Sequence, residues 1–175
     1  MWEVHLETGV INLNGTYQQL QRQLQERGLA GKTGKSVDEQ AKMTGSRQSI
    51  DRIMKPHYFP NPSCGPWQKA NTTAALKAVT DINDIEDYIV PFAGLRGQEC
   101  VRYSCVDYAS VWMCNTNPVT STPRSFIWSY LPQKAMQIFK VCSWPDEPRI
   151  AGRINEMGGL NAKFTTAILR QKCDT

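Results

Sequence analysis

Six cysteines are the side chains in this sequence best suited to covalent or metal chemistry. They are even in number and all follow residue 60: Cys64, Cys100, Cys105, Cys114, Cys142 and Cys173. None form a Cys-x-x-Cys pair, and the two histidines, His5 and His57, lie far from them in sequence. Zinc sites usually take their ligands from two clusters with gaps of about two to four residues. We therefore favour structural disulfides over free buried thiols or a metal site.

A Gly-Lys-Ser triplet at residues 34–36 is similar to the end of a phosphate-binding loop. The first glycine of such a loop would stand at position 29, which is Leu29. Ser36 followed by Glu39 fits the capping box of a helix start, in which each side chain satisfies the other's free backbone N–H. We therefore expect a helix start here and no nucleotide site.

One acid–base pair can be nominated for catalysis. His57 with Glu99 would supply the histidine and carboxylate that ribonuclease-like cleavage needs. No nucleophile or second acid stands near His57 in sequence. We interpret His57 as a structural or surface histidine, and we expect neither enzymatic activity nor a cofactor.

The composition restricts the compartment and the class of partner. The net charge is +4, with Lys and Arg spread along the chain, so we expect a mildly basic surface and no nucleic-acid partner. No apolar run approaches the ~20 residues of a transmembrane helix. The disulfide interpretation implies a secreted, extracellular protein whose signal peptide has been removed. Asn14 and Asn71 begin Asn-x-Thr sequons and are candidate glycosylation sites.

Periodicity defines the elements that must position the cysteines. Residues 100–114 alternate with a period of two on both sides of a short polar turn, which predicts a β-hairpin. Helices are predicted at 67–88 and from about 126 to 142, each with one apolar stripe. Short strands are predicted at three further places: 57–59, 149–154 and 164–170.

This order predicts an α+β fold with two domains. Residues 57–175 would form a disulfide-stabilised two-layer α/β sandwich of split β-α-β-β-α-β, ferredoxin-like topology. Residues 1–56 would form a mainly helical extension or pro-segment-like arm. Six cysteines allow fifteen pairings, among which the sequence does not choose. We prefer Cys100 with Cys173, because the predicted topology places the start of the second strand near the end of the fourth.

The cysteine spacing resembles that of a family of small secreted fungal proteins. The resemblance rests on Cys-x4-Cys-x8-Cys-Asn at residues 100–115, preceded by Cys64-x-x-Trp67 and followed by Cys142, Gly152 and Cys173. It spans about residues 60–173. The family overlaps with candidate plant-pathogen effectors, some of which share the α/β fold of fungal killer toxins.

The resemblance implies a secreted, non-enzymatic, virulence-associated effector that binds a host plant protein, and we expect a monomer. Large aromatic side chains dominate interface energetics, so Trp128, Tyr130 and Trp144 are the candidate anchors for the partner. The alternative is a killer-toxin-like antimicrobial protein that acts on the membranes of competitors. Its best feature is the amphipathic helix expected at 17–27, which is rich in glutamine and carries little charge.

Overall fold

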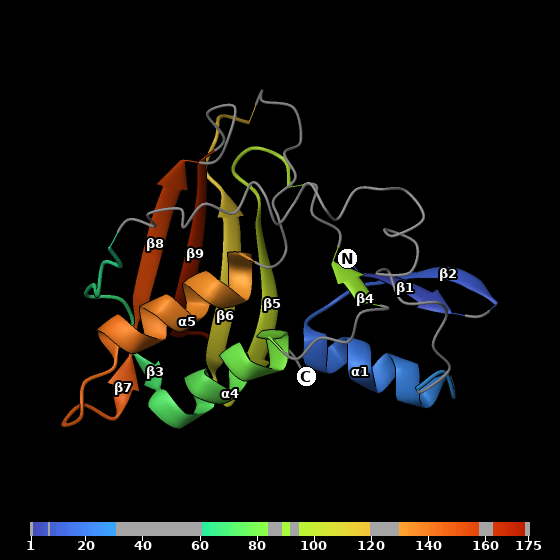
Figure 1. Ribbon diagram of the computed structural model, residues 1–175, viewed down its shortest axis with the longest axis horizontal. Coiled ribbons are helices and arrows are strands. Elements are labelled where there is room, and N and C mark those ends of the chain that lie inside the picture. Colours follow the sequence, from blue (N-terminus) through green and yellow to red (C-terminus); the bar gives the residue numbers. More distant parts are fainter. Residues whose placement is uncertain are drawn as a thin grey trace, which may run out of the picture. The chain divides into compact units, whose positions relative to one another are not determined.

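The computed structural model describes residues 2–6, 8–30, 61–83, 89–91, 95–119, 130–157 and 163–173. These residues belong to two compact units (Figure 1). The first unit holds β1, β2, α1 and β4, and the second unit holds the remaining elements.

The first unit joins a small antiparallel sheet to one helix. The strands β1 (Trp2–Leu6), β2 (Gly9–Leu13) and β4 (Ile89–Pro91) pair in the order β2-β1-β4. In β1, Trp2, Val4 and Leu6 are buried and alternate with half-buried residues, as in a strand with one face on a core. The sequence predicts a mainly helical extension over residues 1–56; the described part of it holds β1 and β2 as well as α1, and residues 31–56 lie outside the described residues.

The helix of this unit, α1 (Tyr17–Glu26), is capped at its start. Thr16 and Gln19 form a reciprocal capping box, in which the Thr16 backbone N–H donates to Gln19 Oε1 at 2.8 Å. Leu20 and Leu24 are fully buried on one side of the helix. The helix ends before Gly28, whose φ of 64° is easily adopted by glycine.

The second unit is built on a four-stranded antiparallel sheet. Its strands are β5 (Cys100–Val106), β6 (Ala109–Asn115), β8 (Gly152–Met157) and β9 (Lys163–Arg170), in the order β5-β6-β9-β8. Two helices, α4 (Thr72–Asn83) and α5 (Tyr130–Cys142), pack on this sheet (Figure 1). Two short strands, β3 (Ala70–Asn71) and β7 (Arg149–Ile150), form a separate antiparallel pair.

These observations confirm the α+β class, but they do not confirm the ferredoxin-like split order. In that order the strand before the first helix lies inside the sheet, beside the strand that ends the hairpin. Here β6 pairs with β9. The predicted first strand, 57–59, lies outside the described residues. The predicted helix start near Trp67 is incorrect, because Ala70 and Asn71 pair with β7 and α4 begins only at Thr72.

The predicted hairpin is confirmed. Cys100 pairs with Cys114 and Val106 with Ala109, and a register shift lies between Arg102 and Ser104. The turn residues Asp107 and Tyr108 have φ of 44° and 66°, which suits a hairpin turn that follows the right-handed strand twist.

The helices cover one face of the four-stranded sheet. Val111, Met113, Ile154 and Ile168 on this face are fully buried. A Cβ at Gly152 would lie 2.6 Å from Ile138 Cγ2 and 2.8 Å from Cys142 Sγ, so α5 approaches the β8 backbone closely. Any side chain at Gly152 would therefore push the two layers apart.

All six cysteines form disulfides, namely Cys64–Cys142, Cys100–Cys114 and Cys105–Cys173. The preference for Cys100 with Cys173 is wrong. Since β5 and β9 are both antiparallel to β6, they run in the same direction and finish at the same end of the sheet. The end of β9 therefore leads to Cys105, near the end of β5, while Cys100 lies opposite Cys114 in the hairpin.

The first prediction concerns the two disulfides of β5. The chain-entropy model gives about 4 kcal/mol for the Cys105–Cys173 disulfide, whose sequence separation is 68, and about 3 kcal/mol for Cys100–Cys114, whose separation is 14. The double variant C105A/C173A should therefore lose more free energy of unfolding than C100A/C114A in urea titrations. A larger loss for C100A/C114A would contradict the loop-length argument. Non-reducing peptide mapping of the unmodified protein checks the pairing itself.

The second prediction concerns Tyr103, at the register shift in β5, whose side chain is 1% exposed. Burial, with a smaller contribution from the negative charge of Glu99, raises the pKa of Tyr103 well above its ordinary value of 10.0. The unfolded chain releases this proton first, so stability falls as the pH rises above 10. Each further pH unit should cost about 1.4 kcal/mol relative to the Y103F variant. Urea unfolding of both proteins at increasing alkaline pH measures this difference, and parallel curves would refute it.

Candidate functional site

The segment that follows α5 forms a fixed turn, called here the Trp144 turn (residues 144–149). Trp144 and Glu147 form an antiparallel bridge, and the Glu147 N–H donates to the Trp144 carbonyl oxygen at 3.1 Å. The Thr72 N–H, at the start of α4, donates to the Pro148 carbonyl oxygen at 2.9 Å. The Cys64–Cys142 disulfide anchors the chain just before the turn. The turn is therefore held at both ends.

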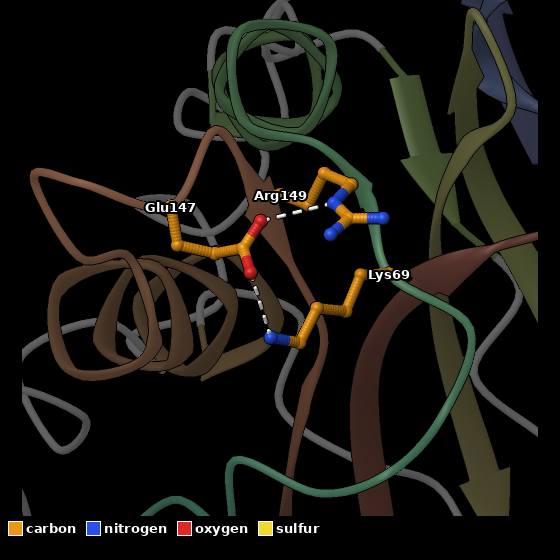
Figure 2. Close-up of polar contacts among 3 residues, drawn as sticks. All are labelled: Lys69, Glu147 and Arg149. Carbon is orange, nitrogen blue, oxygen red and sulfur yellow. Dashed lines mark hydrogen bonds and ion pairs between the residues drawn. The ribbon is translucent and has the colours of Figure 1, made fainter.

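Two ion pairs fix the side of this turn that contacts β3. Glu147 Oε1 accepts a hydrogen bond from Arg149 Nε at 2.9 Å, and Glu147 Oε2 accepts one from Lys69 Nζ at 3.2 Å. Figure 2 shows the carboxylate lying between the two cations. The hydrogen bonds from Arg149 and then Lys69 lower the pKa of Glu147 below its ordinary value, against a small opposing effect of desolvation.

Trp144 itself is exposed. Its side chain is 66% accessible, and Val141, in the last turn of α5, is 48% accessible. A large aromatic ring on a backbone that is already ordered loses little further conformational entropy when it binds. This combination suits a contact point for another molecule better than it suits catalysis.

Of the three aromatic anchors predicted from the sequence, the structure places only Trp144. Trp128 lies outside the described residues. Tyr130 is the first residue of α5, and its side chain also lies outside what the structure describes. Their part in any interface stays a prediction.

Both candidate glycosylation sites lie beside helix starts. Asn14 is exposed, and Thr16 of the same sequon is 5% exposed because it caps α1. Asn71 is also exposed, and its Oδ1 accepts a hydrogen bond from the Ala74 N–H at 3.1 Å. Helix capping by Thr16 and Asn71 is therefore sufficient to explain these residue types, whether or not either sequon is glycosylated. Modification of either residue stays a prediction.

The nominated acid–base pair is not brought together in the described residues. His57 lies outside them, as does the Gly-Lys-Ser segment at 34–36 with Glu39. Glu99 is exposed, and its Oε2 accepts a hydrogen bond from the Arg96 N–H at 2.7 Å. Within the described ranges, no group of three or more His, Cys, Asp or Glu side chains could hold a metal ion.

The motif residue Asn115 has a structural role. It is fully buried at the end of β6, where its Nδ2 donates to the Leu95 carbonyl oxygen at 2.9 Å. Its Oδ1 accepts a hydrogen bond from the Asn117 N–H at 3.0 Å. The Cys-Asn pair of the sequence motif therefore fixes the loop before β5 to the loop after β6.

A second surface was missed by sequence reasoning. Residues that face each other across an antiparallel ladder share one face of the sheet. Trp112 lies opposite both Arg102 and Ala167, and Ala167 lies opposite Arg153, so all four lie on the face away from the helices. We call this the open face. Its described strand positions are Cys100, Arg102, Cys105, Ser110, Trp112, Cys114, Arg153, Asn155, Met157, Lys163, Thr165, Ala167 and Leu169.

Two arginine–tryptophan pairs lie on the open face. The guanidinium carbon of Arg102 lies 5.4 Å from the centroid of the Trp112 ring, and that of Arg153 lies 4.8 Å from the centroid of Trp67. The alternation of residues in the hairpin places Arg102 and Trp112 on the face opposite the core, and this pattern could have predicted their proximity. Trp67 could not be placed from sequence, because its position depends on the Ser63 backbone pairing with Arg153.

One buried cation also escaped the sequence analysis. Lys134 on α5 is fully buried, which is rare for lysine. It lies three residues after Leu131 and four before Ile138, on the apolar side of the helix, and it was missed because only apolar residues were counted.

Comparisons with known proteins found no relative. No protein-family model matches the chain, and neither a curated protein nor a solved structure matches it. Among the described helices, none has the length and apolar character required to cross a membrane.

The third prediction tests the charge arrangement of the Trp144 turn. The R149A substitution should raise the pKa of the Glu147 carboxyl towards its ordinary value of 4.5 more than K69A does, because the Arg149 hydrogen bond is the larger cause of the lowered pKa. NMR titration of the Glu147 side-chain carboxyl carbon measures both shifts. The pKa of Glu147 is lower in the folded protein than in the unfolded chain. The ion pairs therefore stabilise the turn at pH values above 4.5, and this stabilisation is lost as the pH falls through the pKa of the folded protein. Equal shifts in the two variants would contradict the assignment.

Proposed function

We propose that this protein acts outside the cell, without catalysis, by binding another protein through the Trp144 turn. The observation that carries the proposal is the exposed Trp144 ring on a backbone held by a disulfide, a β-pair and two ion pairs. The cysteine pattern described above adds the kind of partner, a host plant protein bound by an effector-like molecule.

Three disulfides are consistent with a secreted or extracellular protein, because such bonds persist in oxidising compartments. An unfolded or flexible loop would lose conformational entropy on binding, which weakens the complex. The Trp144 turn avoids most of that loss, because its backbone is already paired. Truncation of a central interface tryptophan typically costs at least about 2 kcal/mol.

The membrane-acting alternative requires α1 to bind lipid, and the burial of its apolar residues argues against this. A membrane-binding helix needs an accessible apolar face. Leu20 and Leu24, which form the apolar stripe of α1, are fully buried in the first unit. We therefore give preference to protein binding.

The fourth prediction tests Trp144. Extracellular fluid from plant leaves is passed over the immobilised protein, and candidate partners are those displaced by soluble, untagged protein. For the purified partner, W144A should weaken the dissociation constant by about 30-fold, equivalent to about 2 kcal/mol. The measurement is surface plasmon resonance with wild-type and variant proteins.

The matched control for W144A is V119A, because Val119 is also an exposed apolar residue, with 72% accessibility. It should change the dissociation constant by less than about threefold. A partner that binds W144A as tightly as the wild type would show that the Trp144 turn is not the binding surface.

A further inference from the structure

The open face has a one-sided charge. Among its described strand positions, Arg102, Arg153 and Lys163 are cationic, and there is no Asp or Glu. The carboxylate of Glu147, by contrast, already lies between two cations on the Trp144 turn. In the described part of the structure, no ion pair neutralises Arg153 or Lys163. The face is therefore complementary to an anion.

The open face is partly accessible as well as charged. Arg153, Asn155 and Lys163 are exposed, Arg102 and Trp112 are half-buried, and Ser110 and Ala167 are buried. On the opposite face, Val111, Met113, Ile154 and Ile168 are fully buried under the helices. A sheet with one buried face and one solvated face is common in antiparallel folds.

The residues form a row that crosses all four strands. From β5 to β8 the order is Arg102, Trp112, Ala167 and Arg153, and the Trp67 ring lies beside Arg153 at the far end. Three strand spacings of about 4.8 Å separate the two arginines by roughly 14 Å. Ala167, between Trp112 and Arg153 in the row, is small and buried. Arg102 Nη1 also donates to the Lys172 carbonyl oxygen at 2.7 Å, so Arg153 is the more exposed cation of the row. One small anion cannot meet both guanidinium groups, whereas a chain with repeated charges can.

We propose that the open face binds a linear polyuronate chain, a polysaccharide with one carboxylate on each sugar. A planar carboxylate matches the planar guanidinium fork of arginine. The Asn155–Thr165 side-chain pair on the same face supplies polar groups for sugar hydroxyls.

A single-stranded nucleic acid fits the open face less well. Nucleic-acid platforms combine a strongly basic groove with aromatic rings that are free to stack on bases. Here only three cations occupy the described face, and each tryptophan ring already has a guanidinium over it. The disulfides also favour an extracellular ligand. This inference goes beyond the protein-binding proposal and does not depend on it, because the Trp144 turn is not part of the row.

The test is isothermal titration calorimetry with size-fractionated linear galacturonate oligomers at low and moderate salt. Wild-type protein should bind these oligomers and should not bind a neutral glucan of similar length. R153A should weaken the dissociation constant by about tenfold, as expected for the loss of one charge-assisted hydrogen-bonding group. K163A should weaken it by a smaller factor, since Lys163 lies outside the row.

The matched control is R22A, because Arg22 is an exposed arginine on α1, in the other unit. It should leave the affinity unchanged. The proposal is overturned if the oligomers do not bind, if R22A weakens binding as much as R153A, or if a single-stranded DNA oligonucleotide binds more tightly than the galacturonate oligomer. W144A should retain galacturonate binding, which separates this proposal from the one on the Trp144 turn.

Discussion

The pairing of β6 with both β5 and β9 is the constraint on which the second unit depends. It sets two strands parallel to each other on either side of β6, so that the ends of β5 and β9 meet. It also determines which residues of β5 and β9 share a sheet face, because the residues of β6 pair with both neighbouring strands. From this register follow the Cys105–Cys173 disulfide, the buried helix-side core and the charged row on the other face.

The hairpin, the α+β class and the disulfide state follow from local patterns, which is why the sequence predicts them. The alternation around Asp107 is contained in fifteen residues, and an even number of cysteines without metal spacing leaves few alternatives. The predicted strand order is not confirmed and the Cys100 preference is wrong, because both depend on long-range pairing. Nothing near Phe164 in sequence indicates that its strand will lie beside β6 rather than at an edge.

The candidate surfaces divide in the same way. Trp144 could be nominated from composition alone, since a tryptophan in a proline-rich turn is poorly suited to a core. The ion pairs that hold its turn join Lys69 to Glu147, which are far apart in sequence, so no local pattern reveals them. The row on the open face depends on the register of four strands at once, and only the Arg102–Trp112 part of it lies within a single hairpin.

The central position of β9 has a consequence for biosynthesis. In a chain made from the N-terminus, β6 is complete at Asn115, whereas its second neighbour begins only at Lys163. Throughout that interval one hydrogen-bonding edge of β6 has no neighbouring strand, although α4 can already pack on β5 and β6. The Cys105–Cys173 disulfide therefore cannot form before the chain beyond β9 has been made, and Cys105 must stay reduced or exchangeable until then. Cys64 and Cys142 both precede β9, so their disulfide has no such requirement.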